Sequence, residues 1–230
     1  YKGIGFGKKA NEPIEIPSQA KKFMMLKDYQ GKEQAEKVTN YIDPIYLEIA
    51  AEIIKEATLK FDKVNHDILI PLADHIYYAM KRYEENIIPF NPFIQDMKLL
   101  FPDEYAVALK GKEIIKQQIH REINEDEVGF ISLHVHSAIS SNKVGESMEA
   151  IRVVHENINR LQKNLNIKID VDTISYARLM NHIKFLIIRL NTNEKLQMDI
   201  SEFTKTKFPF AYEQAVRMCQ DLSKVLKKPL

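Results

Sequence analysis

After residue 40, apolar residues recur every three or four positions, which is the spacing of one face of an α-helix. Ile42, Ile45, Ile49 and Ile53 form the first such stripe. Pro71 fits the first turn of the next helix, because a proline there loses no hydrogen bond. The apolar face of that helix consists of Leu72, Ile76, Ala79 and Tyr83. These stripes predict amphipathic helices that pack on one another.

Two further segments follow the same rule. Asn124 precedes a run of acids, Glu125-Asp126-Glu127, and then apolar residues, which is the pattern of a capped helix start. Leu179, Ile183, Leu186 and Leu190 repeat the spacing of the Leu72 face. Strand-like patterns are limited to the glycine-rich start and, weakly, to residues 130–135. The predicted fold class is therefore all-α.

The chain repeats itself at an offset of 107 residues. Asp74-His75-Ile76, followed by Arg82, is echoed by Asn181-His182-Ile183, followed by Arg189. At the same offset, Phe101-Pro102 and Tyr105 recur as Phe208-Pro209 and Tyr212. A period of this length is one small domain rather than a solenoid repeat. The sequence therefore predicts a duplicated helical-bundle domain.

The expected boundaries follow from the repeat and from composition. We expect a short β-rich remnant of another domain at residues 1–27 and a polar linker at 28–36. The first copy is expected at 37–142 and the second at 143–230. Each copy is long enough to bury a modest core.

Composition excludes several classes of protein. The formal charge of +1 gives the whole chain no general attraction for nucleic acid or anionic lipid. Cys219 is the one cysteine, so no disulfide forms within the chain and a reducing cytoplasm is the expected location. No apolar run reaches the length of a membrane helix, so no membrane insertion is expected.

The repeated histidines are the main candidate site. His75 and His182 are expected at the rim of an apolar helix face, where one ring nitrogen can contact an incoming ligand. Imidazole is partly neutral and nucleophilic at cell pH. Arg82 and Arg189 follow two helical turns later, where each could meet an anion carried by the histidine. The alternative is that a duplicated fold has copied two structural histidines.

The other histidines give weaker signals. His134 and His136 would share a metal on a strand, but on the expected helix they point about 200° apart, so no metal site is predicted. His66-Asp67 resembles half of a metal phosphohydrolase dyad, although Asp67 also suits a helix cap. Solvated helix positions account for His120 and His155. No cofactor is indicated.

Three segments together carry a family resemblance. Lys2-Gly3-Ile4-Gly5-Phe6-Gly7-Lys8-Lys9 resembles the end of the RNA-binding co-antiterminator domain of the BglG/SacY family of transcription antiterminators. Asp74-His75-Ile76 with Arg82, and the segment 127–138, resemble the two histidine segments of a phosphotransferase-system regulation domain. Residues 101–105 and the His-x-His form are most similar to glucose-operon antiterminators of Gram-positive bacteria.

The resemblance implies a dimeric RNA-binding switch and not an enzyme. His75 and His134 match the phosphoacceptors of the first regulation domain, and His182 matches the first acceptor of the second. The implied partners are a second copy of the chain, the phosphocarrier HPr, the glucose permease and an antiterminator hairpin in mRNA. Asp74, Arg82 and Arg189 are expected to support the phosphosites.

The resemblance also implies what each end of the chain contributes. Lys2, Gly5, Phe6, Lys8 and Lys9 would belong to the RNA-binding remnant, which is expected to be too short to bind RNA with useful affinity. The counterpart of His134 would fall at about position 241, so the second domain is expected without its last helix.

The expected mechanism is electrostatic. Phosphate gives a histidine roughly two negative charges, which would repel their symmetry mates at a dimer contact. Asp74 is expected to orient the unmodified ring of His75. Two alternatives stay open: a helical interaction module with structural histidines, and a metal-dependent phosphohydrolase built on His66 and Asp67.

Overall fold

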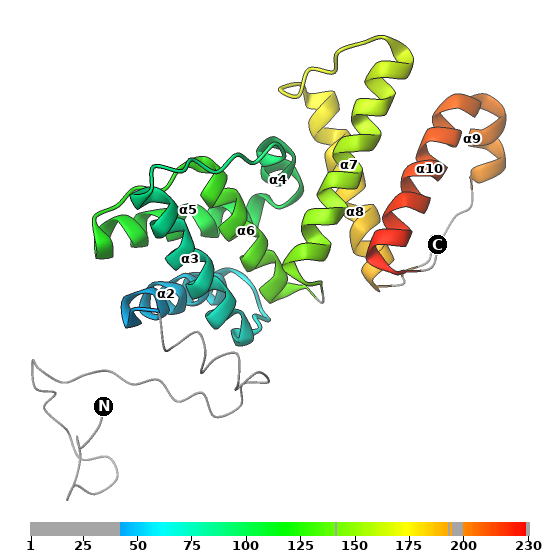
Figure 1. Ribbon diagram of the computed structural model, residues 1–230. Coiled ribbons are helices and arrows are strands. Elements are labelled where there is room, and N and C mark those ends of the chain that lie inside the picture. The colour runs from blue at the N-terminus through cyan, green and yellow to red at the C-terminus, as the bar shows by residue number, and fades with distance from the viewer. Residues whose placement is uncertain (1–41, 141, 193, 195–199, 229–230) are drawn as a thin grey trace, which may run out of the picture.

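A computed structural model describes residues 42–140, 142–192, 194 and 200–228, and every regular element in these ranges is helical (Figure 1). This confirms the predicted all-α class for that part of the chain. The predicted remnant at 1–27, the linker at 28–36 and the five predicted RNA-binding residues lie outside the described residues. None of the described helices is long and apolar enough to cross a membrane.

The helices form two successive groups. The first group is α2 (Pro44–Lys60), the short 3₁₀ helix η1 (His66–Ile68), α3 (Leu69–Glu84), α4 (Ile94–Leu100), α5 (Pro102–Ile119) and α6 (Glu125–Ile139). The second group is α7 (Val144–Leu165), α8 (Ile174–Thr192), α9 (Ser201–Lys207) and α10 (Pro209–Leu226).

Local chemistry explains where several helices begin. The Asn124 side chain accepts the backbone N–H of Glu127 and caps α6, as predicted. Pro71 lies in the first turn of α3, also as predicted. The prediction that Asp67 is a cap was wrong, because the Asn65 side chain caps η1 by accepting the N–H of Asp67.

The duplication is confirmed by the helix boundaries. A shift of 107 residues carries α4 onto α9 and α5 onto α10, and the first and last positions of the helices in each pair then coincide. Phe101 and Phe208, which precede α5 and α10, also share nearly the same backbone angles, at φ −127°, ψ 54° and φ −135°, ψ 58°. One local structure is therefore encoded twice.

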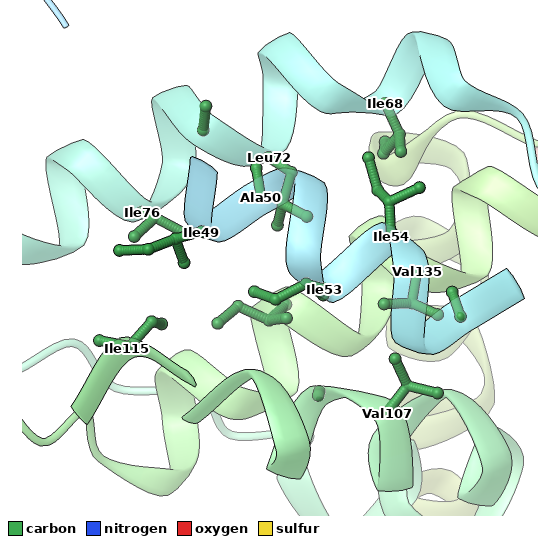
Figure 2. Close-up of a cluster of buried hydrophobic side chains, with 14 of the residues drawn as sticks. Ile49, Ala50, Ile53, Ile54, Ile68, Leu72, Ile76, Val107, Ile115 and Val135 are labelled. Carbon is green, nitrogen blue, oxygen red and sulfur yellow. The ribbon is translucent and has the colours of Figure 1, made fainter. Parts of the chain in front are cut away.

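The first core lies between α2, α3, α5 and α6. Figure 2 shows side chains such as Ile49, Ile53, Leu72 and Ile76 pointing toward one another, and all four are buried. Burial of one large aliphatic side chain contributes about 1.5–3 kcal/mol, so this cluster holds the first group together. Tyr83 is the exception to the predicted face, because 48% of it is exposed.

A second core joins the two groups. Met97, Leu100 and Phe101 pack in one cluster with buried residues of α7, α8 and α10. Figure 1 shows α4 on the side of the first group that faces α7 and α8. Of the predicted face of α8, Ile183 and Leu190 are buried, whereas Leu179 and Leu186 are half-buried. The contact between the groups is therefore apolar and extends across the repeat boundary.

Candidate functional site

Two of the predicted histidines meet in the first group. His75 on α3 and His134 on α6 have ring centroids 5.0 Å apart. Phe130, one turn before His134 on α6, places its ring 6.0 Å from that of His75, edge to face. The packing of α3 against α6 thus brings two histidines that are far apart in the chain into one small aromatic cluster.

Glu127 connects His75 to Arg82, and sequence reasoning did not assign it this role. Arg82 donates to Glu127 Oε1 from Nε at 3.0 Å and from Nη2 at 2.7 Å. His75 Nε2 lies 3.1 Å from the other carboxylate oxygen, Oε2. Neither of these two atoms forms an aligned hydrogen bond, so the His75–Glu127 contact is close but poorly directed.

The charge of Glu127 is held in place by its partners. The side chain is almost completely buried, which by itself would raise its pKa. His75 and Arg82 outweigh that cost and hold the pKa of Glu127 below its usual value. The carboxylate is therefore ionised at neutral pH and ties α3 to α6.

His134 is kept neutral by its surroundings. Burial and then the neighbouring His75 lower its pKa to about 3. Its Nδ1 is buried without a hydrogen-bond partner, and so is Nε2 of His75, although other atoms of both residues reach the surface. The pair therefore has buried nitrogens without hydrogen-bond partners next to a buried carboxylate. Such groups cost stability and are typical of functional sites.

A pocket of about 340 Å³ lies beside Glu127. Its apolar wall comes from the end of α3 and the following loop, and includes Met80, Tyr83 and Ile88. Glu127 and Asn124 form part of the other wall, at the start of α6. Glu127 therefore belongs both to the wall of this pocket and to the contacts with His75 and Arg82.

His136 points to a different part of the fold. Its Nδ1–H donates to Glu104 Oε1 at 2.9 Å, and its ring packs on Phe101 with centroids 4.1 Å apart. Glu104 belongs to α5, whereas the partner of His134 is on α3. The predicted divergence of the two rings on a helix is confirmed.

His182, the repeat of His75, lies in a different environment. It is exposed on α8, and so is Arg189. In the first group α6 covers the face that holds His75, and the described part of the second group has no helix in that place. The same difference leaves Phe208 60% exposed, whereas its counterpart Phe101 is 5% exposed.

His155 was predicted to be a solvated helix residue, and this was wrong. Its Nδ1 lies 2.8 Å from Asp96 Oδ2, and its ring packs against Phe93 with centroids 5.1 Å apart. The same carboxylate accepts the Tyr176 hydroxyl at 2.7 Å. Asp96 on α4 thereby joins α7 and α8, and no sequence pattern marked it.

Comparisons with known proteins agree with the repeat. A family model described as PRD domain matches residues 47–138 and 155–230. A protein named GlcT from Staphylococcus haemolyticus (strain JCSC1435) is 31% identical over 234 residues, covering 100% of this chain and 82% of that protein. The PtsGHI operon antiterminator of Bacillus subtilis (strain 168) is 31% identical over 232 residues, with the same coverage of both proteins.

Further similarity is found in a third protein and in a solved structure. The GlcA/glcB genes antiterminator of Staphylococcus carnosus (strain TM300) is 31% identical over 226 residues, which covers 94% of this chain and 77% of that protein. A crystal structure titled GlcT CAT-PRDI is 32% identical in sequence, with a TM-score of 0.47, and covers 59% of this chain and 80% of that one.

Proposed function

Because this chain belongs to the PRD family and is a GlcT-like transcription antiterminator, we propose that it is a phosphorylation-controlled regulator whose first switch is His75. The observation that carries the proposal is the contact of the His75–His134 pair with Glu127, which Arg82 holds from the opposite side. A regulator of this kind needs a histidine whose modification changes a contact between helices.

Phosphate on His75 would compete with Glu127. A phosphoryl group on Nε2 adds roughly two negative charges where the Glu127 carboxylate now lies 3.1 Å away. Glu127 would be repelled, and the guanidinium of Arg82 would be free to bind the phosphate in its place, since Arg suits either anion. The link between α3 and α6 would then break.

His134 fits the role of a second acceptor. Its low pKa leaves the ring neutral, and a neutral ring keeps the lone pair that attacks phosphorus. Nε2 of His75 and Nδ1 of His134 are both buried. A phosphoryl donor therefore reaches them only after α3 and α6 separate. His182 is exposed and would accept phosphate without such opening.

The remaining parts of the proposal come from family membership. The donors would be HPr and the glucose permease, the target an mRNA hairpin of a glucose phosphotransferase operon, and the active form a homodimer. Asp74 would help to orient His75, and Arg189 would serve His182 as Arg82 serves His75. We retain the domain boundary at 142/143 as part of this proposal.

Antitermination in cells tests the switch. Reporter expression from a glucose-type terminator should differ between His75→Ala, which cannot be phosphorylated, and His75→Asp, which carries a permanent negative charge. His120→Ala, at an exposed helix end, serves as the matched control. If both His75 variants match the parent in reporter output and in dimerisation, the assignment of His75 is wrong and an interaction module with structural histidines is the better account.

A further inference from the structure

The tautomer of His155 is fixed by the fold. Asp96 is 4% exposed and accepts the Tyr176 hydroxyl on Oδ1 at 2.7 Å. Its Oδ2 lies 2.8 Å from His155 Nδ1. An ionised carboxylate only accepts hydrogen bonds, so Nδ1 must carry the proton and donate it. In the neutral ring the lone pair is therefore on Nε2.

Solvent has access to that nitrogen. The His155 side chain is 34% exposed, compared with 17% for His75 and 13% for His136. The buried nitrogens without partners include Nε2 of His75 and Nδ1 of His134, but not Nε2 of His155. Phe93 packs against the ring and, with Asp96, keeps it from turning.

These features are those of a nucleophilic histidine. A carboxylate that holds one ring N–H sets the orientation of the imidazole and raises the basicity of the other nitrogen. His155 is not a copy of the repeated histidines, because Glu48 occupies its position in the first repeat. It is therefore a site outside the His75–His134 arrangement.

We propose that His155 is an additional phosphoacceptor of this chain and takes a phosphoryl group on Nε2 from a donor of the phosphohistidine class. The natural donor rests on the function proposed above. The N–P bond of the donor breaks and its electron pair stays on the donor imidazole, while Nε2 of His155 forms the new N–P bond. The proton on Nδ1 stays where it is.

Modification would tighten the contact between the two groups of helices. The phosphorylated ring keeps its Nδ1 proton and so becomes an imidazolium beside the Asp96 carboxylate. A hydrogen bond between two charged groups is shorter and stronger than one to a neutral donor. Phosphate at His155 would thus strengthen the attachment of α7 to α4, whereas phosphate at His75 would weaken that of α3 to α6.

The test uses phosphoramidate, a small histidine-phosphorylating reagent, on the unsubstituted protein, with phosphohistidine mapped by mass spectrometry at near-neutral pH. His66 and His120 are exposed, and their rings have no carboxylate partner among the described residues. His155 should be labelled severalfold faster than either, although it is less exposed. If labelling follows exposure alone, with His66 and His120 ahead, the inference is overturned.

Two variants separate orientation from packing. Asp96→Asn can donate to Nδ1 and move the proton to Nε2, so it should slow labelling of His155 by about tenfold, as loss of an orienting partner commonly does. Tyr176→Phe loosens the same contact but keeps the carboxylate, so His155 should stay ahead of both controls. Equal rates in all three proteins would contradict the proposal.

Failure of this inference can be distinguished from failure of the proposed function. Phosphate transferred by the glucose permease to His75, together with no phosphoramidate label on His155, removes this inference and leaves the regulator intact. Label on His155 with none on His75, His134 or His182 from any carrier protein removes the proposed switch and leaves His155 as a phosphoacceptor.

Discussion

The ring centroid of His75 lies 5.0 Å from that of His134, and the shared environment gives the two rings unequal roles. His134 is neutral because burial and the neighbouring His75 both oppose its protonation. His75 faces the carboxylate of Glu127. The pair is thus a neutral histidine next to one with an acidic partner.

His134 should make the fold sensitive to acid. Its pKa is about 3 in the folded protein and about 6.5 in an unfolded chain, so the unfolded state binds more protons between these values. The free energy of unfolding should therefore fall as pH decreases from 6.5, by at most about 1.4 kcal/mol per pH unit from this residue. When the free energy of unfolding is measured by urea denaturation at a series of pH values, it should change less steeply with pH in His134→Leu than in the parent. His66→Asn, at an exposed position, should keep the parent slope, and identical slopes for all three proteins would refute the effect.

Glu127→Gln should destabilise the protein by about 2 kcal/mol, because Arg82 loses its anionic acceptor in a buried position. The contribution of Glu127 is present above the carboxyl pKa of the unfolded chain, about 4.3, and is lost as pH falls through its lowered folded pKa. Glu125→Gln is the matched control. Glu125 is in the same helical turn and pairs with Lys98, but it is exposed, so its loss should cost less than about 1 kcal/mol. Equal midpoints of denaturation for the two variants would count against a special role for Glu127.

Arg82→Lys should lower the rate of phosphoryl transfer to His75 by about tenfold. Both Nε and Nη2 of Arg82 reach one carboxylate oxygen, and a lysine ammonium cannot reproduce that fork. Initial rates with the phosphorylated soluble domains of the glucose permease as donor give the comparison. Arg121→Lys, at an exposed position over the Tyr83 ring, should keep the parent rate. A rate for Arg82→Lys that matches Arg121→Lys would exclude guanidinium recognition.

Gly129→Ala should destabilise the contact of α6 with α4 by about 1 kcal/mol. A Cβ at this position would lie 2.7 Å from Ile94 Cδ1 and 2.9 Å from Asn91 Nδ2, and these side-chain ends would have to move. Gly145→Ala, on α7, would meet nothing within 4 Å and should be neutral or slightly stabilising. Thermal unfolding of both variants measures the difference, and a Gly129→Ala protein as stable as Gly145→Ala would contradict this packing.

Much of the fold follows from local patterns. The apolar stripes predicted α2 and α3, Asn124 predicted the start of α6, and the 107-residue offset predicted that α9 and α10 repeat α4 and α5. These signals lie within a few residues of one another or recur in the second copy, so a single sequence displays them.

The acidic partners of the histidines could not be predicted in the same way. Glu127 already had an explanation as an acid in the first turn of a capped helix, and its contact with Arg82 depends on how α3 crosses α6. Asp96 and His155 meet only because α4 packs between the two groups of helices. The exposure of Tyr83 and of His182 depends on which helix covers each face, and the stripe on one helix does not contain that information.

Phosphoryl transfer to the paired histidines is the decisive test of the proposed switch. The protein is incubated with phosphoenolpyruvate, enzyme I, HPr and the soluble domains of the glucose permease, and acid-labile phosphate is mapped by mass spectrometry at near-neutral pH. We expect phosphate on His75 or His134 that depends on the permease and falls when Arg82 is replaced by Lys. Folded protein that takes no phosphate on either histidine from either donor would contradict it.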